Sequence, residues 1–317
     1  MKIAVVGAGA VGCLFGAYLA RAGHSVELIG RPALVSGILD HGLVVQGPTT
    51  GSFRVAARTA LAPDDAPDCV LLTVKTFDLA SAASALARVH AAPMPLLLPQ
   101  NGLGVERTAS DALGAAGWPA PLDWTVRAVN SVPATLVAPG VVREGGSGEI
   151  VLADPGTAGV AAPHILLFRD LFRGAGLSVR TVDDLEREIW RKAIVNAAIN
   201  PVTALLGVTN GELAHGSARD QALALLGEAR QVARAAGFEF SEKESIADLD
   251  RVVHATAPNR SSMLQDLDRG RPTEIASISG EIVRVAEAHG LDVPATRAVI
   301  HEVERRVAAR RLSPQPS

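Results

Sequence analysis

The chain has 317 residues, of which 48% are hydrophobic and 20% charged, with a formal net charge of -3. A chain of this length usually forms more than one hydrophobic core, so two domains are expected. The charge gives no basic surface for nucleic acid or an anionic membrane, and a small-molecule partner is favoured instead. Cys13 and Cys69 lie in apolar runs without metal or disulfide spacing, which is typical of core residues in a reducing cytoplasm.

The beginning of the chain combines an apolar run, a glycine motif and a helical pattern. Residues 2–6 predict a strand, Gly7-Ala8-Gly9-Ala10-Val11-Gly12 follows directly, and residues 13–21 predict a helix before a second strand at 25–29. In this order the first glycine permits a tight turn, the second lets the backbone approach a pyrophosphate, and the third lets helix pack on strand. The motif is therefore predicted to bind a dinucleotide, with the amides at the helix start holding its phosphates.

A secretory signal is an alternative interpretation of the N-terminus. Lys2 precedes apolar residues up to Ala20, and a stretch of small residues precedes Cys13. A signal needs no glycine spacing and does not explain the second strand, so the nucleotide-binding interpretation is preferred. No other segment of the sequence has the length and apolarity of a membrane span, and a cytoplasmic protein is expected.

The end of the second predicted strand indicates which dinucleotide is bound. NAD-binding units usually place Asp or Glu there to accept the ribose hydroxyls, whereas this chain has Gly30-Arg31. A guanidinium can pair with the 2'-phosphate of NADP. Arg31 therefore predicts NADPH as the cofactor, although Arg31-Pro32 is also compatible with a solvated loop.

Further apolar runs predict additional strands of a parallel sheet, at residues 69–74, 96–98 and 125–129. Lys75 follows the first run and Asn101 closely follows the second, so both are expected at the carboxyl edge, where open α/β sheets bind ligands. Alternatively, Lys75 is an ordinary loop cation and Asn101-Gly102 an ordinary turn. The glycine-rich segments 140–148 and 154–159 predict hairpin turns at the sheet edge.

From about residue 183 the pattern changes to helical periodicity. Lys192, Asn196 and Asn200 fall at i, i+4 and i+8, so on a helix they lie in one row. Burying such groups unpaired costs about 1–3 kcal/mol per amide and more for the ammonium, so the row is expected to face a ligand cleft. The predicted domains are an α/β Rossmann-type NADP-binding domain at 1–182 and an all-α substrate and catalytic domain at 183–317.

Several motifs, taken in order, resemble the ketopantoate reductase family. They are the glycine motif, Thr73-Val-Lys75, Gln100-Asn101-Gly-Leu-Gly104, the WRKAIVNAAINP segment at 190–201, and RSSMLQD at 260–266 with Pro272-Thr-Glu274. The resemblance runs from residue 1 to about 300 and implies a Rossmann domain followed by a helical domain like the C-terminal domain of 6-phosphogluconate dehydrogenase. It also implies NADPH-dependent reduction of 2-dehydropantoate to (R)-pantoate, a step of pantothenate and coenzyme A biosynthesis.

The same resemblance implies roles for individual residues. Lys192 is expected to be the general acid, and Glu274 to complete the catalytic polar cluster. The implied substrate-binding residues are Asn101, Asn196, Asn200 and Ser262. Lys75 and Asn101 are implied near the nicotinamide end of the cofactor, and Glu274 is implied to bind the cofactor as well. The chemistry is consistent with these roles, because hydride arriving at a ketone carbon leaves charge on the oxygen, which an ammonium can stabilise and protonate.

Each of these residues also has a structural alternative. Ser262 with Gln265 fits a helix capping box, and Glu274 suits the first turn of the following helix. Lys192 could extend to the surface, leaving the asparagines to bridge neighbouring helices.

Other functions remain open at this point. Arg127 and Arg143 could shape the pocket for a different 2-oxo acid, and a non-catalytic NADPH sensor is an alternative of another class. The histidines show no metal spacing, so no metal is expected. A homodimer through the helical domain is compatible with the sequence, which does not separate an interface from a core.

Overall fold

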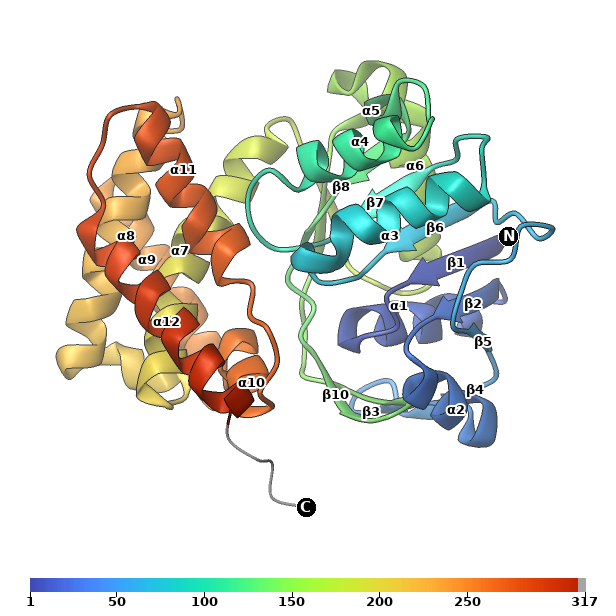
Figure 1. Cartoon of the computed structure of the whole chain (residues 1–317), viewed down its shortest axis with the longest axis horizontal. Helices are drawn as coiled ribbons and strands as arrows, with labels where there is room; N and C mark the ends of the chain where they lie inside the picture. Colours follow the sequence, from blue (N-terminus) through green and yellow to red (C-terminus); the bar gives the residue numbers. More distant parts are fainter. Residues whose placement is uncertain (313–317) are drawn as a thin grey trace. The chain divides into compact units, whose positions relative to one another are not determined.

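The computed structural model describes residues 1–312, which form two compact units (Figure 1). The first unit contains residues 1–100 and 105–185, and the second contains residues 101–104 and the chain from 186 onward. A short loop that the sequence placed in the first domain therefore groups with the helices. Residues 313–317 of the predicted helical domain lie outside the described part of the chain.

The main sheet of the first unit is six-stranded and parallel. In spatial order its strands are β5 (Ala56–Arg58), β2 (Ser25–Ile29), β1 (Lys2–Val6), β6 (Cys69–Leu72), β7 (Leu96–Leu98) and β8 (Thr125–Arg127). From β1 the chain first adds β2 and β5 on one side, and then β6, β7 and β8 on the other side. This strand order is typical of dinucleotide-binding folds. The predicted Rossmann-type sheet is confirmed, and β1 and β2 have the predicted bounds.

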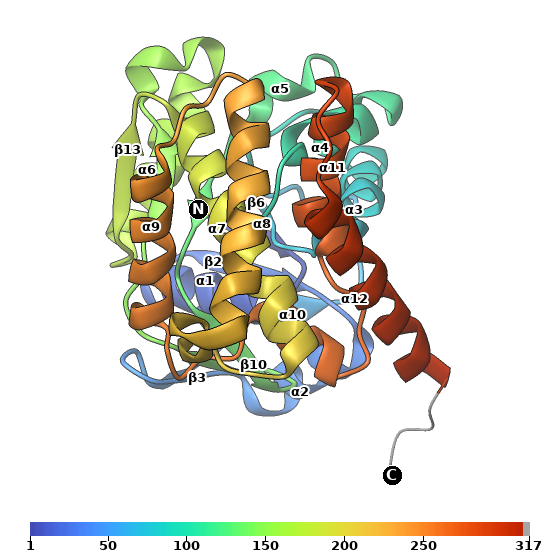
Figure 2. The ribbon, with the colours of Figure 1, turned by 90° about the vertical axis from the view of Figure 1, so that its left-hand side faces the viewer.

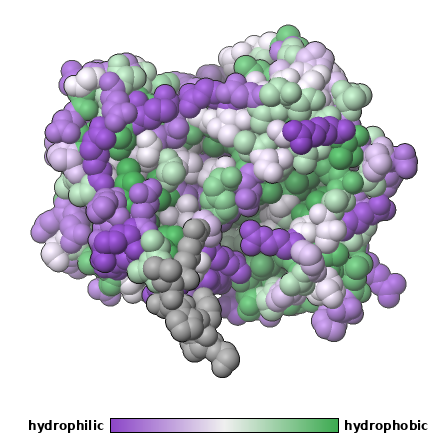
Figure 3. Space-filling model, in the orientation of Figure 1, coloured by the Kyte–Doolittle hydropathy of each residue, from purple (hydrophilic) through white to green (hydrophobic). Residues whose placement is uncertain are grey.

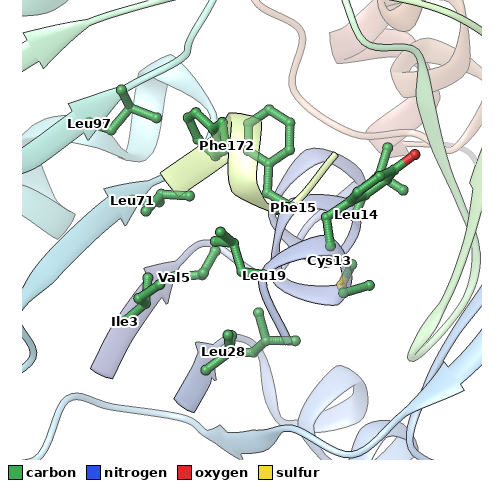
Figure 4. Close-up of a cluster of buried hydrophobic side chains, with 14 of the residues drawn as sticks. Ile3, Val5, Cys13, Leu14, Phe15, Leu19, Leu28, Leu71, Leu97 and Phe172 are labelled. Atoms are coloured by element: carbon green, nitrogen blue, oxygen red, sulfur yellow. The ribbon is translucent and has the colours of Figure 1, made fainter. Parts of the chain in front are cut away.

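Helices cover both faces of this sheet. On one face Val5 of β1 packs with Phe15 and Phe172, whose rings lie 5.1 Å apart (Figure 4). On the other face Val6 packs with Leu79 and Val105. The helices that supply these residues are α1 (Ala10–Arg21) and α6 (Ala162–Gly174) on the first face, and α3 (Thr76–Val89) and α4 (Val105–Ala115) on the second. Because both faces are covered, the central strands are apolar at nearly every position.

Two smaller sheets also belong to the first unit. One contains β10 (Ala134–Ala138), β11 (Val141–Glu144), β3 (Leu43–Gln46) and β4 (Gly51–Phe53), and the other contains β13 (Val179–Val182), β12 (Ile150–Ala153) and β9 (Val129–Asn130). Gly140 lies in the turn of the β10–β11 hairpin. The hairpin predicted at 154–159 is wrong, because Asp154 accepts a hydrogen bond from Gly156 N–H at 2.8 Å and caps a short 3-10 helix, η1 (Pro155–Thr157).

The described part of the second unit is helical (Figure 2). They are α7 (Leu185–Leu206), the 3-10 helix η3 (Asn210–Ala214), α8 (Gly216–Ala235), α9 (Glu242–Ala255), α10 (Ser262–Asp268), the π-helical turn η4 (Ala276–Gly280), α11 (Glu281–Ala288) and α12 (Pro294–Leu312). The all-α prediction is confirmed. Hydrophilic residues predominate on the face of this unit seen in Figure 3. Within residues 1–312, no helix combines the length and apolarity needed to cross a membrane.

Candidate functional site

The glycine motif forms the turn between β1 and α1. Gly7 has a φ of +104°, and a Cβ there would lie 2.3 Å from Val74 N. A Cβ on Gly12 would lie 2.4 Å from the Gly7 carbonyl oxygen. For a Cβ on Gly9 the nearest atom would be that same oxygen, at 3.9 Å. Gly7 and Gly12 therefore permit close packing, whereas Gly9 leaves room beside the backbone for a ligand.

The start of α1 fits an anionic group. Within residues 1–312, no side chain caps this helix at Gly9, and its first turn carries no acidic residue. The amides of Ala10, Val11 and Gly12 have no acceptor inside the helix, and the helix dipole adds positive potential at this end. Ala8 is buried, and its N–H donates to the Ile29 carbonyl at 3.0 Å, which fixes the turn against β2. The arrangement can hold a phosphate or pyrophosphate.

Thr73 supports this turn in a way that its place in the sequence did not reveal. Its hydroxyl donates to the Gly7 carbonyl oxygen at 2.7 Å, and its backbone N–H donates to the Val6 carbonyl at 2.7 Å. In the sequence Thr73 lies near the end of an apolar run and opens the Thr73-Val-Lys75 motif, but neither signal identified this contact. Thr73 therefore holds the glycine turn from the β6 side.

Arg31 and Lys75 lie at the same edge of the sheet as the glycine turn. They follow β2 and β6, the two neighbours of β1, as the N-cap residues of α2 (Pro32–His41) and α3. Lys75 is partly buried. Arg31 Nη2 lies 3.8 Å from Asp78 Oδ2, and the two side chains are 80% and 50% exposed. Such an exposed pair contributes little to stability, so both charges can respond to a ligand at this edge.

The two arginines considered as pocket-shaping residues have other contacts within the first unit. Arg127 is buried, its Nε lies 2.7 Å from Glu106 Oε1, and its Nη1 donates to the Leu98 carbonyl at 2.9 Å. Arg143 is exposed on β11 and donates to Gln46 Oε1 at 3.3 Å. The Arg127 guanidinium therefore ties β8 to β7 and α4.

In the second unit, Lys192, Asn196 and Asn200 lie on α7 in helical register. Lys192 and Asn196 are partly buried, and Asn200 is only 6% exposed. Ion pairs fix this part of α7 to α9, since Arg191 Nη2 lies 2.8 Å from Glu244 Oε1 and Arg191 Nε lies 3.4 Å from Asp248 Oδ2. A cation and two amides are thus presented from a helix that is held in place.

The loop at 101–104 packs against the segment that carries Glu274. Asn101 Nδ2 donates to Glu274 Oε2 at 3.5 Å, and Leu103 N–H donates to the Ser277 carbonyl at 3.3 Å. Gly102 has a φ of +91°, and a Cβ there would lie 2.2 Å from the Ser277 carbonyl oxygen. Glu274 is 6% exposed. The structure therefore brings together Asn101 and Glu274, which lie far apart in the sequence.

The predicted capping box is displaced by one residue. Ser261, and not Ser262, is the N-cap of α10, and its Oγ accepts a hydrogen bond from Leu264 N–H at 3.1 Å. Gln265 Nε2 reaches back to the Arg260 carbonyl at 3.0 Å. Ser262 is the first residue of α10 and is exposed, so its hydroxyl is not used for capping.

Cys13 contacts the glycine motif, because its Sγ donates a hydrogen bond to the Ala8 carbonyl oxygen at 3.4 Å. Cys13 and Cys69 are buried and unbridged, and burial raises the pKa of each thiol to about 12. Among the described residues, no group of three or more His, Cys, Asp or Glu side chains is arranged to hold a metal ion.

Comparisons with known proteins identify the same family over nearly the whole chain. The family model "Ketopantoate reductase PanE/ApbA" matches residues 3–156, and its "C terminal" counterpart matches residues 184–306. A 2-dehydropantoate 2-reductase of Archaeoglobus fulgidus is 34% identical over 95% of this chain and 96% of its own length.

Solved structures extend this similarity to the fold. A PanE/ApbA family ketopantoate reductase from Ralstonia eutropha JMP134 has a TM-score of 0.85 and 32% identity, covering 98% of this chain and all of that one (100%). A D-mandelate dehydrogenase in a ternary structure with NADH and anilino(oxo)acetate has a TM-score of 0.89 and 26% identity, covering 99% and 100%. With matching family models over both units and relatives along nearly its full length, the chain belongs to the ketopantoate reductase PanE/ApbA family.

Proposed function

We propose that this protein is an NADPH-dependent reductase that converts 2-dehydropantoate into (R)-pantoate in pantothenate biosynthesis. Support comes from its family and from relatives named as 2-dehydropantoate 2-reductases. The observation that carries the proposal is the α7 row, in which partly buried Lys192 and Asn196 lie one turn apart and Asn200 lies a turn further on, 6% exposed. This row suits a substrate that has both a ketone and a carboxylate.

Groups of the first unit suit the phosphates and the adenosine end of the cofactor. The amides at residues 10–12 are suited to the pyrophosphate, and Arg31 is assigned to the 2'-phosphate. Lys75 is assigned to the nicotinamide end, and Asn101 and Glu274 of the second unit are also proposed to bind the cofactor. The D-mandelate dehydrogenase relative, which holds NADH, supports a nicotinamide cofactor as the class.

The proposed mechanism assigns proton transfer to α7. Bound NADPH supplies the hydride that reduces the ketone carbon. Lys192 Nζ donates a hydrogen bond to the ketone oxygen, stabilises the negative charge that develops there and gives up its proton. Asn196 and Asn200 donate to oxygen atoms of the substrate, and Ser262 binds its carboxylate side. Glu274 orients Asn101 through their 3.5 Å hydrogen bond.

A second candidate keeps the chemistry and changes the substrate. The similarity to a D-mandelate dehydrogenase, with a TM-score of 0.89, favours a reductase that acts on another 2-oxo acid. The same residues would carry the reaction, because each 2-oxo acid presents the same ketone and carboxylate. Only the pocket around the remaining part of the substrate would differ.

The test is oxidation of NADPH by the purified protein with 2-dehydropantoate, the 2-oxo acid corresponding to mandelate, and branched 2-oxo acids, with NADH in parallel. Turnover of 2-dehydropantoate with a clear NADPH preference is expected. Turnover of another acid alone would move the protein to the second candidate. If NADPH bound and no acid were reduced, a sensor would replace both enzyme proposals.

The role of Lys192 is tested by Lys192→Ala. We expect kcat to fall by about 10²–10⁴-fold with NADPH binding retained, because the proton donor is lost. Lys243→Ala is the matched control, since Lys243 is an exposed lysine on α9 of the same unit. Loss of NADPH binding in Lys192→Ala, or turnover equal to that of the control, would remove Lys192 from the mechanism.

A further inference from the structure

Thr203 connects two elements that carry proposed substrate-binding residues. It is fully buried (0% exposed) on α7, and its Oγ1 lies 2.7 Å from Ser261 Oγ. The same Oγ1 lies 2.8 Å from the Ile199 carbonyl oxygen and 3.2 Å from that of Asn200. Ser261 is 5% exposed. A single hydroxyl therefore joins the turn of α7 that carries Asn200 to the start of α10.

The proton count fixes how this contact works. Thr203 has one hydroxyl proton, and the two carbonyl oxygens can only accept. The Thr203 hydroxyl donates toward Ser261 Oγ and toward the carbonyl oxygens of Ile199 and Asn200, so these three acceptors share its single proton. Ser261 Oγ then still has a lone pair for Leu264 N–H, which lies 3.1 Å away. The result is a continuous chain of hydrogen bonds from the first turn of α10 into α7.

The position of this chain gives it a specific consequence. Pro201 lies inside the continuous helix α7, between Asn200 and Thr203, and it has no N–H to donate to the preceding turn. Ser261 directly precedes exposed Ser262. The Thr203–Ser261 contact therefore lies between Asn200 and Ser262, and it adds a directional link to the apolar packing of Ala204 with α10. Lys192 lies two turns earlier, where Arg191 and its carboxylate partners hold α7 to α9.

We propose that Thr203 is a positioning residue that sets the spacing between Asn200 and Ser262 and thereby the affinity for the carboxylate side of the 2-oxo acid. This inference rests on the proposed function. It predicts that loss of the hydroxyl changes substrate binding and leaves proton donation by Lys192 in place. A mere destabilisation would instead reduce the amount of active enzyme, which lowers apparent kcat without changing KM.

The experiment compares Thr203→Val with Thr203→Ser in the full chain. Thr203→Val removes the buried hydroxyl that donates to Ser261 Oγ, and we expect KM for the 2-oxo acid to rise about tenfold, with kcat within about twofold and NADPH affinity unchanged. Thr203→Ser keeps the hydroxyl and is expected to restore KM to within about twofold of the parent value.

Thr296→Val provides the matched control. Thr296 is also a buried threonine of the second unit, 2% exposed, and its Oγ1 donates to Glu228 Oε2 at 2.7 Å. This variant should lower the melting temperature without raising KM. Equal KM values in Thr203→Val and the parent, or an equal rise in Thr296→Val, would overturn the positioning role. Failure of the parent to reduce any 2-oxo acid would instead overturn the proposed function.

Discussion

Gly102 approaches the Ser277 carbonyl oxygen so closely that a Cβ on Gly102 would lie 2.2 Å from it. Its φ of +91° adds a second reason why a side chain is excluded there. The contact seats Asn101 beside Glu274, which accepts its hydrogen bond. A single backbone contact therefore supports one of the two polar groupings described in the second unit.

The first prediction concerns this contact. Gly102→Ala should destabilise the protein by more than the roughly 1–3 kcal/mol of a strained backbone, because the clash adds to the strain. It should also lower kcat/KM by displacing Asn101. Gly290→Ala is the control, since Gly290 has a φ of +67° and nothing within 4 Å of the added Cβ. Equal losses of unfolding free energy in urea for the two variants would contradict the assigned clash.

The second prediction concerns cofactor choice. Arg31→Ala should weaken NADPH binding by about 10–100-fold, because a charge-assisted hydrogen bond to the 2'-phosphate is lost, and should leave NADH binding nearly unchanged. Binding is measured by fluorescence of the reduced nicotinamide. Arg143→Ala removes another exposed arginine of the first unit and should affect neither cofactor. If Arg31→Ala lost affinity for NADH as much as for NADPH, Arg31 would not be the residue that recognises the 2'-phosphate.

The third prediction concerns Asp78, which lies 3.8 Å from Arg31. A carboxylate beside a phosphate site repels the phosphate and competes for the guanidinium. Asp78→Asn should therefore raise NADPH affinity by about two- to fivefold, and the gain should shrink as salt increases. The measurement is the ratio of NADPH to NADH dissociation constants at low and high ionic strength. A ratio that does not change would show that Asp78 plays no part in discrimination.

The fourth prediction concerns the start of α12. Glu228 on α8 accepts hydrogen bonds from the N–H groups of Ala295 and Thr296 at 2.8 and 2.7 Å, which serves as a cap supplied by a distant helix. Glu228→Gln keeps one acceptor and should reduce unfolding free energy by about 1–2 kcal/mol with kcat/KM unchanged. Glu239→Gln, at an 81% exposed carboxylate, should change stability by much less. Urea titration of both variants tests the comparison.

The fifth prediction follows from the cysteine thiols. Burial raises the pKa of Cys13 and Cys69 from 9.0 to about 12, so at every pH below that value the thiolate fraction is smaller than for an exposed cysteine. A thiol-specific disulfide reagent at about pH 8 should label neither cysteine in the native protein and both in denaturant. Rapid labelling of the native protein would show that one of the two sites opens to solvent.

Local patterns predicted the elements of the first unit well. The bounds of β1 and β2 follow from β-branched residues beside a glycine turn, and these signals act over a few residues. The α7 row was equally readable, because a helix fixes the phase of residues four apart. The family and the two fold classes could therefore be predicted before any coordinates were known.

Contacts between distant residues explain what the sequence left undetermined. The sequence indicated Ser262 as the cap of α10, whereas the chemically identical Ser261 takes that position and is contacted by Thr203, far away in the chain. Likewise, Arg127 looked available for a ligand until the structure placed Glu106 beside it. Periodicity and motif spacing describe residues that are close in sequence, so they do not predict such pairings.

The grouping of residues 101–104 with the helical unit bears on how family members can be recombined. If two family members exchanged their chains after residue 185, residues 101–104 would come from one protein. The Ser277 carbonyl and Glu274 carboxylate that they contact would be replaced by those of the other protein. A chimera should therefore transplant this loop together with its helices, as a discontinuous module. The segments that must be exchanged together are then residues 101–104 and the chain from residue 186 onward. A single crossover point between two homologous chains would separate them.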